Sequence, residues 1–211
     1  MRRSLAVGFA VLLLGAGAPS LVQAAPEPVI VVGNYNLVEN TPNQMVQIFV
    51  SGGQSVQGLD FSVQVADGGT SLGGTIVAPK ITNVDIFSGT IFAGNNNPSI
   101  PGISSNGQYA LATTTTAAGT VPADGLLATL TFDTTGFFAT GPVTTFDLKL
   151  ANLNGGATDT DFAIIPASIT NGSIHITAAA PEPGSLVLLL CGGAGFFLVL
   201  RRKRAQEPSP A

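Results

Sequence analysis

The sequence is poor in the residue types that most often carry disulfides, nucleic-acid binding or catalysis. Its 211 residues include one cysteine, one histidine and no tryptophan. The cysteine, Cys191, lies in an apolar run near the C-terminus, so a disulfide within the chain is excluded. Between Ala25 and Ala180 there is no arginine, and two lysines stand against ten acidic residues, which gives a net charge of −8. Because contact with a nucleic-acid backbone requires several basic side chains, that class of partner is excluded.

The catalytic inventory is equally small. The histidine, His175, lies between Ile174 and Ile176, where alternation predicts a solvated residue on the outward face of a strand. No Gly-x-Ser-x-Gly elbow is present. Asp159 and Asp161 are spaced to share a face of an extended segment, as a glycosidase pair would, but no tryptophan is available to shape a sugar cleft. We interpret them as solvated loop residues and predict that the protein is not an enzyme.

The first 24 residues have the pattern of a secretion signal. Two arginines precede an apolar run from Leu5 to Gly17, and the segment ends in Val-Gln-Ala, which suits signal peptidase. The run of about 13 residues is shorter than the roughly 20 that a spanning helix requires. We therefore expect signal peptidase to cut between Ala24 and Ala25.

A second apolar segment lies near the C-terminus, from Gly184 to Leu200. It follows a tripeptide and precedes a basic cluster, namely Pro181, Glu182 and Pro183 before it and Arg201, Arg202, Lys203 and Arg204 after it. A helix of this length spans about 25 Å, slightly less than a hydrocarbon core of about 30 Å. We predict one transmembrane helix at about 184–200, a basic stop at 201–204, a disordered cytoplasmic tail at 205–211, and a body outside the cytoplasm.

The order of these C-terminal features resembles a known signal. A Pro-Glu-Pro motif, one apolar helix and an arginine-rich end, at the C-terminus of a chain with a signal peptide, are similar to a PEP-CTERM sorting signal over residues 181–204. The resemblance implies recognition by an exosortase, a membrane-bound, transpeptidase-like cysteine enzyme of Gram-negative bacteria that make exopolysaccharide. The expected processing partners are therefore signal peptidase and an exosortase. They act on a precursor anchored in the inner membrane, and the mature form is expected at the cell surface or in the extracellular matrix.

Residues 25–180 form the predicted folded body, and alternation of apolar and polar residues dominates it. The expected inward positions are Val46, Ile48 and Val50; Leu59, Phe61, Val63 and Val65; Ala128, Leu130 and Phe132; Phe146, Leu148 and Leu150; and Ile174 and Ile176. Asn-Gly and Gly-Gly pairs separate these segments, and the body has no convincing helical stripe. The pattern predicts one all-β domain, an antiparallel β-sandwich.

The order of these segments carries a second resemblance. The segments that carry it are Val31 to Gly33, Val46 to Val50 and Val56 to Val63 at the start, and Asp124 to Phe132, Phe146 to Leu148 and Ile169 to Ile174 at the end. They are similar to the first and last strands of a cohesin-type domain. The resemblance implies a nine-stranded jelly-roll sandwich, in a superfamily that holds cohesins and several carbohydrate-binding modules.

One group of oxygen-bearing residues is a candidate metal site. It surrounds a Gly-Gly bend and comprises Asn152, Asn154, Asp159 and Asp161. Calcium favours six to eight oxygen ligands, but ordinary turn chemistry also explains the Asn-Gly-Gly sequence. We therefore predict no cofactor, with calcium as the alternative that the sequence leaves open.

Two aromatic residues are candidates for stacking on a sugar. They are Tyr109 and Phe138, and packing over the edge of the core is the other interpretation. Taken together, the sequence predicts an exported, non-enzymatic envelope or matrix protein with a β-sandwich as its binding or structural module. The partner is a polysaccharide or another envelope protein, and a carbohydrate-binding module that recognises exopolysaccharide is the alternative.

Overall fold

The computed structural model describes residues 26–99, 101–139, 143–163 and 165–178. The predicted cleavage site at Ala24 and Ala25, the motif at Pro181 and the basic cluster that ends at Arg204 lie outside these residues. No helix within the described part of the chain is long and apolar enough to cross a membrane, and the predicted membrane segment at 184–200 is not in that part. The two terminal signals therefore stay predictions.

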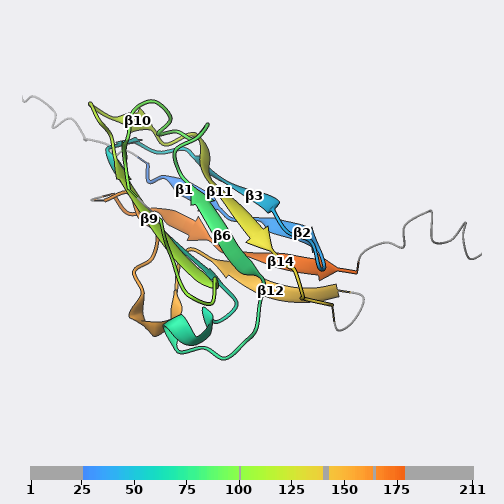
Figure 1. Ribbon diagram of the computed structural model, residues 1–211. Helices are drawn as coiled ribbons and strands as arrows, with labels where there is room; N and C mark the ends of the chain where they lie inside the picture. Colours follow the sequence, from blue (N-terminus) through green and yellow to red (C-terminus); the bar gives the residue numbers. More distant parts are fainter. Residues whose placement is uncertain (1–25, 100, 140–142, 164, 179–211) are drawn as a thin grey trace, which may run out of the picture.

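Two large β-sheets make up the described body (Figure 1). The first, called the β3 sheet, has the strand order β13 (Ser168–Thr170), β1 (Val29–Val31), β3 (Gln44–Ser51), β11 (Gly125–Asp133) and β6 (Lys80–Asp85). The second, called the β5 sheet, has the order β2 (Asn34–Val38), β14 (Gly172–Thr177), β12 (Val143–Lys149), β5 (Gly58–Val65), β9 (Tyr109–Thr115) and β7 (Asn97–Pro98), with β8 (Gly102–Ile103) also on β9.

The remaining elements are short. Strands β4 (Ser55–Val56) and β10 (Val121–Pro122) pair with each other, and two 3₁₀ turns, η1 (Gly69–Leu72) and η2 (Asn154–Gly156), are the helical elements of the described residues. The all-β prediction is thereby confirmed.

Alternation places the core between the two sheets. In β3, Val46, Ile48 and Val50 are buried while Met45 and Phe49 are exposed. The other predicted inward positions are buried in the same way, from Leu59 in β5 to Ile176 in β14. Because successive side chains of a strand point to opposite faces, each strand contributes one apolar row to a shared core.

The prediction of a purely antiparallel sandwich is wrong at two pairings. Strand β1 pairs with β13, and β2 with β14, in parallel. The segments 29–38 and 168–177 run in the same direction and cross together from the β3 sheet to the β5 sheet. At the crossing, a Cβ added to Gly172 would lie 1.7 Å from the carbonyl oxygen of Gly33, so the two backbones touch where glycine removes the side chain.

This crossing also changes the strand count. It divides each of the two segments into two strands, one in each sheet. The described residues form fourteen strands, several of only two or three residues, where the resemblance implied nine. The Asn171-Gly172 pair, a turn signal in the sequence, lies at the crossing.

The outward face of β5 is less exposed than alternation predicts. Ser62 and Gln64 point away from the core, yet both are buried. Strand β12 pairs with β5 only at Gln64 and Val65. Along the rest of that edge of β5, the segment around Thr160 lies where a neighbouring strand would be. The Thr160 hydroxyl accepts the Ser62 N–H at 2.9 Å and donates to the Ser62 carbonyl at 2.7 Å, which replaces a strand pairing with a side chain.

Candidate functional site

The histidine lies on the outward face of β14, as predicted, but it is half-buried by its neighbours. Its Nδ1 is 2.9 Å from the Thr145 hydroxyl of β12, and its Nε2 is 3.0 Å from the Ser173 hydroxyl. Ser173 in turn donates its hydroxyl proton to Asn34 of β2, at 2.8 Å. A serine that donates to Asn34 is not activated by the imidazole, so this row of polar side chains links three strands.

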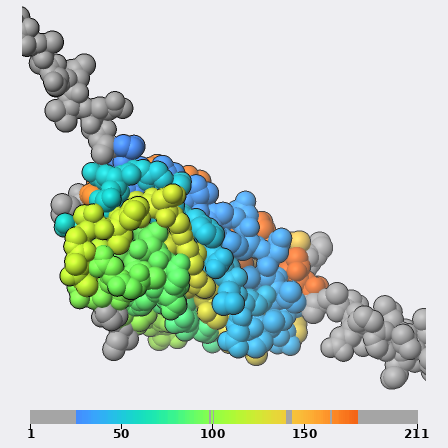
Figure 2. Space-filling model, turned by 90° about the horizontal axis from the view of Figure 1, so that it is seen from above, coloured from blue at the N-terminus to red at the C-terminus, as the bar shows by residue number. Residues whose placement is uncertain are grey.

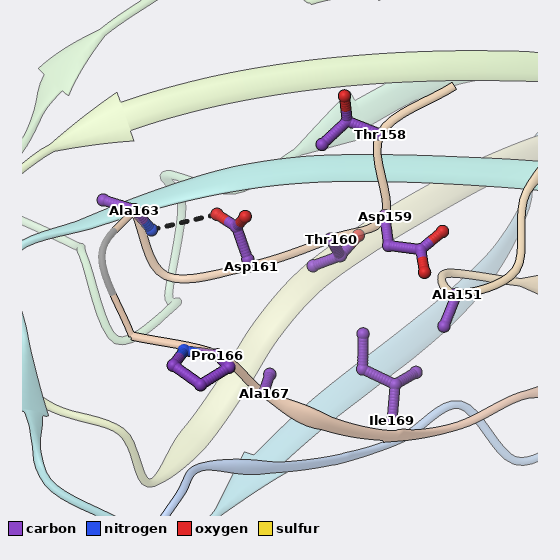
Figure 3. A pocket seen from close by; sticks show the side chains of 9 residues that line it. All are labelled: Ala151, Thr158, Asp159, Thr160, Asp161, Ala163, Pro166, Ala167 and Ile169. Atoms are coloured by element: carbon purple, nitrogen blue, oxygen red, sulfur yellow. Dashed lines mark hydrogen bonds between the residues drawn. The ribbon is translucent and has the colours of Figure 1, made fainter. Parts of the chain in front are cut away.

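Asp159 and Asp161 line a pocket of about 440 Å³ beside β5 and β13 (Figure 3). The Asp161 carboxylate accepts the N–H of Ala163 at 3.0 Å, and the Asp159 carboxylate accepts the N–H of Leu153 at 3.2 Å. Figure 3 shows the two carboxylates turned away from each other along the segment. This divergence does not provide the facing pair that a glycosidase uses.

Burial sets the electrostatics of this pocket. Burial raises the pKa of Asp161, and the charge of Asp60 across the backbone bridge raises it further, while the Ala163 N–H opposes both. Two carboxylates opposite each other on extended strands repel, which makes ionisation of Asp161 less favourable than that of an isolated aspartate. The pocket therefore holds an acid whose charge the protein does not compensate fully.

The four residues of the predicted calcium site do not all line one pocket. Asn154 lines a different pocket from Asp159, and its side-chain amide donates to the Asp67 carbonyl at 3.1 Å. Asn152 is exposed and has a left-handed φ of 58°. Among the described residues there is no group of three or more histidine, cysteine or acidic side chains placed to hold a metal ion. The calcium alternative stays a prediction, with Asp159 and Asp161 as its remaining pair.

The two predicted sugar-stacking residues belong to different elements. Tyr109 begins β9 opposite Gln64 and is half-buried. Phe138 follows β11 in a loop and is 62% exposed, whereas its neighbour Phe137 packs edge-on against Phe146 at a centroid distance of 5.5 Å. Phe137 is thus a core residue and Phe138 a surface residue, and glycan binding by Tyr109 and Phe138 stays a prediction.

The feature that the sequence reasoning missed is an apolar outer face on the β3 sheet. Met45 is 73% exposed and Phe49 52%, and Val31 lies opposite Phe49 in the register of β1 and β3. Leu126 of β11 lies opposite Phe49 on its other side. The signal was present, because Met45 and Phe49 are apolar at outward positions of an alternating strand.

This apolar face carries no charge over three adjacent strands. The outward residues of β13, β1 and β3 are Ser168, Thr170, Val29, Val31, Met45, Gln47, Phe49 and Ser51. A hollow of about 510 Å³ lies between Met45 and Phe49, with Tyr35 at its edge. The Tyr35 hydroxyl donates to the Gln47 carbonyl, and burial raises the pKa of this tyrosine. Strand β1 pairs with β3 only from Phe49 to Ser51, so on that side the β3 residues from Gln44 to Ile48 have no strand partner among the described residues. Tyr35 covers part of this unpaired edge.

No protein-family model matches the chain, and no curated protein matches it. Three solved structures similar to it are cohesin domains. The seventh ScaB type I cohesin from Pseudobacteroides cellulosolvens is 21% identical over 74% of this chain and 96% of that one, with a TM-score of 0.47.

The second is the cohesin of the OlpC cohesin–dockerin complex from Clostridium thermocellum, 15% identical over 74% of this chain and 98% of that one, with a TM-score of 0.46. The third is a non-cellulosomal cohesin from the archaeon Archaeoglobus fulgidus, 11% identical over 76% of this chain and 96% of that one, with a TM-score of 0.45. The similarity is one of fold.

Proposed function

We propose that this protein is an exported, non-enzymatic module of the cell envelope or extracellular matrix, which binds another envelope protein through its β-sandwich. The observation that carries the proposal is the uncharged apolar face formed by Val31, Met45 and Phe49 on the β3 sheet. Exposed apolar side chains that gather on one face of a sheet mark candidate interaction sites. Methionine and phenylalanine are also enriched in the buried centres of protein interfaces.

The charge distribution supports a protein partner at this face. The folded body carries a net charge of −8, so most of its surface repels other acidic molecules. The outward positions of β13, β1 and β3 are free of charge, and a partner seated there avoids the cost of burying an unpaired carboxylate. The face also belongs to a hydrogen-bonded sheet, so its residues are already ordered before binding.

The absence of catalysis is supported by the partners of the candidate residues. His175 is held between two hydroxyl groups, and Asp159 and Asp161 are turned apart. In both places the polar groups are used in hydrogen bonds that stabilise the fold. Such an arrangement suits a binding or structural module better than a hydrolase.

Delivery to the envelope is the second part of the proposal. Its support is the pair of terminal signals, the signal peptide at 1–24 and the PEP-CTERM-like segment at 181–204. Mass spectrometry of the mature protein from its host tests this part directly. We expect an N-terminus at Ala25 and a C-terminus near Pro181, and a mature chain that retained Arg204 would overturn exosortase processing.

The binding part is tested by paired substitutions on the two sheets. Met45→Ser with Phe49→Ser removes the apolar centre of the β3 face, while Leu111→Ser changes an exposed leucine on β9 of the β5 sheet. Truncation of a hot-spot residue at the centre of an interface weakens binding by about 2 kcal/mol or more, roughly thirtyfold in Kd. We expect binding to the isolated envelope fraction to fall for the double variant and to stay unchanged for Leu111→Ser. Equal binding by the unmodified protein and both variants would contradict the proposal.

A further inference from the structure

A second group of exposed apolar residues surrounds the end of β14. Val38 and Val143 both lie opposite Thr177 in the strand register, one on each side of it. Val38 is 40% exposed and Val143 49%. The preceding row of the sheet, which includes Leu37 and Ile176, is buried in the core, so Val38 and Val143 point outward.

Phe138 belongs to the same end of the molecule. Its loop is held to the residues that follow Val38, because Asn40 donates its N–H to the Phe137 carbonyl at 3.1 Å and Ala139 donates to the Glu39 carboxylate at 2.8 Å. Since Phe137 turns into the core, Phe138 is directed outward. Figure 2 shows the N-terminal strands and the end of β14, blue and orange, together at this end of the body.

The length of chain beyond β14 indicates lipid as the occupant of this surface. Six residues, 178–183, separate Thr177 from the predicted membrane segment that begins at Gly184. Even fully extended, this connection spans at most about 25 Å. Figure 1 shows that β14 ends at the opposite end of the sandwich from the start of β1. Val38 and Val143 lie beside the last residue of β14, so a membrane segment that begins at Gly184 would place this end of the body nearest the bilayer.

We propose that Val38, Phe138 and Val143 rest in the lipid interface while the C-terminal segment spans the membrane. This inference depends on the delivery part of the proposed function. A short tether holds the surface at a high effective concentration near the bilayer, so three apolar side chains suffice where a free protein would need many. The contact orients the body, presents Pro181-Glu182-Pro183 close to the membrane surface and directs the opposite end of the sandwich away from the lipid.

The absence of tryptophan makes the inference directly testable. Phe138→Trp introduces the only indole of the chain at the proposed contact, and Phe49→Trp introduces it at a similarly exposed phenylalanine on the outer face of the β3 sheet. Each full-length variant is reconstituted into phosphatidylcholine vesicles with or without brominated acyl chains. We expect the emission of the Phe138→Trp protein to be blue-shifted in both kinds of vesicle and to be quenched by the brominated lipid. The Phe49→Trp emission should change little in either.

Vesicle flotation of the same samples separates the two levels of the proposal. If the chains do not float with the vesicles, the membrane segment is wrong and the lipid contact fails with it. If they float and the Phe138→Trp indole is not quenched, or both indoles are quenched equally, the lipid contact alone is overturned. An indole at position 138 that responds to the host polysaccharide and not to lipid would overturn it in favour of the glycan interpretation.

Discussion

The outer faces of the two sheets differ in how their polar groups are used. On the β5 sheet, Gln64 is fully buried, and its polar atoms are satisfied: its side chain donates to the Ala66 carbonyl and accepts the N–H of Asn154. On the β3 sheet, the corresponding outward residues Met45 and Phe49 are open to solvent. The β5 sheet is thus covered at its centre, around Ser62 and Gln64, by its own connecting segments, whereas the centre of the β3 sheet presents uncovered apolar side chains.

The difference indicates where the molecule is free to bind. A buried polar group requires all its hydrogen bonds, so the side chains that cover β5 have little freedom to exchange partners. The half-exposed Asp67 carboxylate is also held, since it accepts the N–H groups of Gly69, Thr75 and Ile76 and fixes the loop of residues 67–76. The face without such a cover is the one that gains most from a partner.

The largest expected effect is at the crossing that the two sheets share. Gly172→Ala places a methyl group against the Gly33 carbonyl, and neither backbone can move without breaking the parallel pairings on either side. Overpacking of this kind costs about 3 kcal/mol of unfolding free energy. Urea unfolding measures it, with Gly52→Ala as control. That position is open, so the control loses only about 1 kcal/mol to its positive φ, and equal losses would contradict the role of the crossing.

A direct test of the contrast exchanges a hydroxyl for a methyl on each sheet. Thr160→Val removes both bonds to the Ser62 backbone and leaves a buried N–H and carbonyl without partners. We expect a loss of about 2 kcal/mol. Thr129→Val, on the half-exposed outer face of β11, is expected to change stability by less than about 0.5 kcal/mol. Thermal unfolding measures both, and similar values would remove the distinction between the two faces.

Two aspartates beside β5 are predicted to have opposite effects on the pH dependence of stability. Burial raises the pKa of Asp67, but the N–H groups of Ile76, Thr75 and Gly69 outweigh it and lower the pKa overall. Its stabilising contribution is therefore complete above the unfolded value of about 3.9 and is lost as the pH falls through the lower folded value. The pKa of Asp161 is raised, so its ionisation destabilises the fold as the pH rises above about 3.9.

Two variants separate these contributions. Asp67→Asn should lower stability at neutral pH and flatten the acid limb of the stability curve. Asp161→Asn should give a small gain at neutral pH, because the amide oxygen still accepts the Ala163 N–H while the repulsion from Asp60 disappears. Denaturant midpoints between pH 3 and pH 7 measure both, and changes of the same sign would show that the two environments are alike.

The sequence could predict whatever depends on local alternation. The inward positions of Val46, Ile48 and Val50 were predictable, because successive side chains of a strand alternate between its two faces. It could not predict that Thr160 would pair with Ser62, a residue 98 positions away, since such contacts depend on the path of the whole chain. For the same reason, the parallel crossing at Gly33 and Gly172 could not be predicted, and the Asn171-Gly172 pair indicated only an ordinary turn.

The smallest expected effect is on stability at the apolar face itself. Phe49→Thr leaves a β-branched residue in β3 and removes a side chain that is half in water, so the free energy of unfolding should change by less than about 0.5 kcal/mol. Phe61→Leu, a milder change on a fully buried ring of β5, should cost about 1 kcal/mol or more. If Phe49→Thr destabilised the protein more than Phe61→Leu, then Phe49 would be needed for the stability of the fold. In that case its exposure on the outer face of the β3 sheet would be no evidence of a binding site.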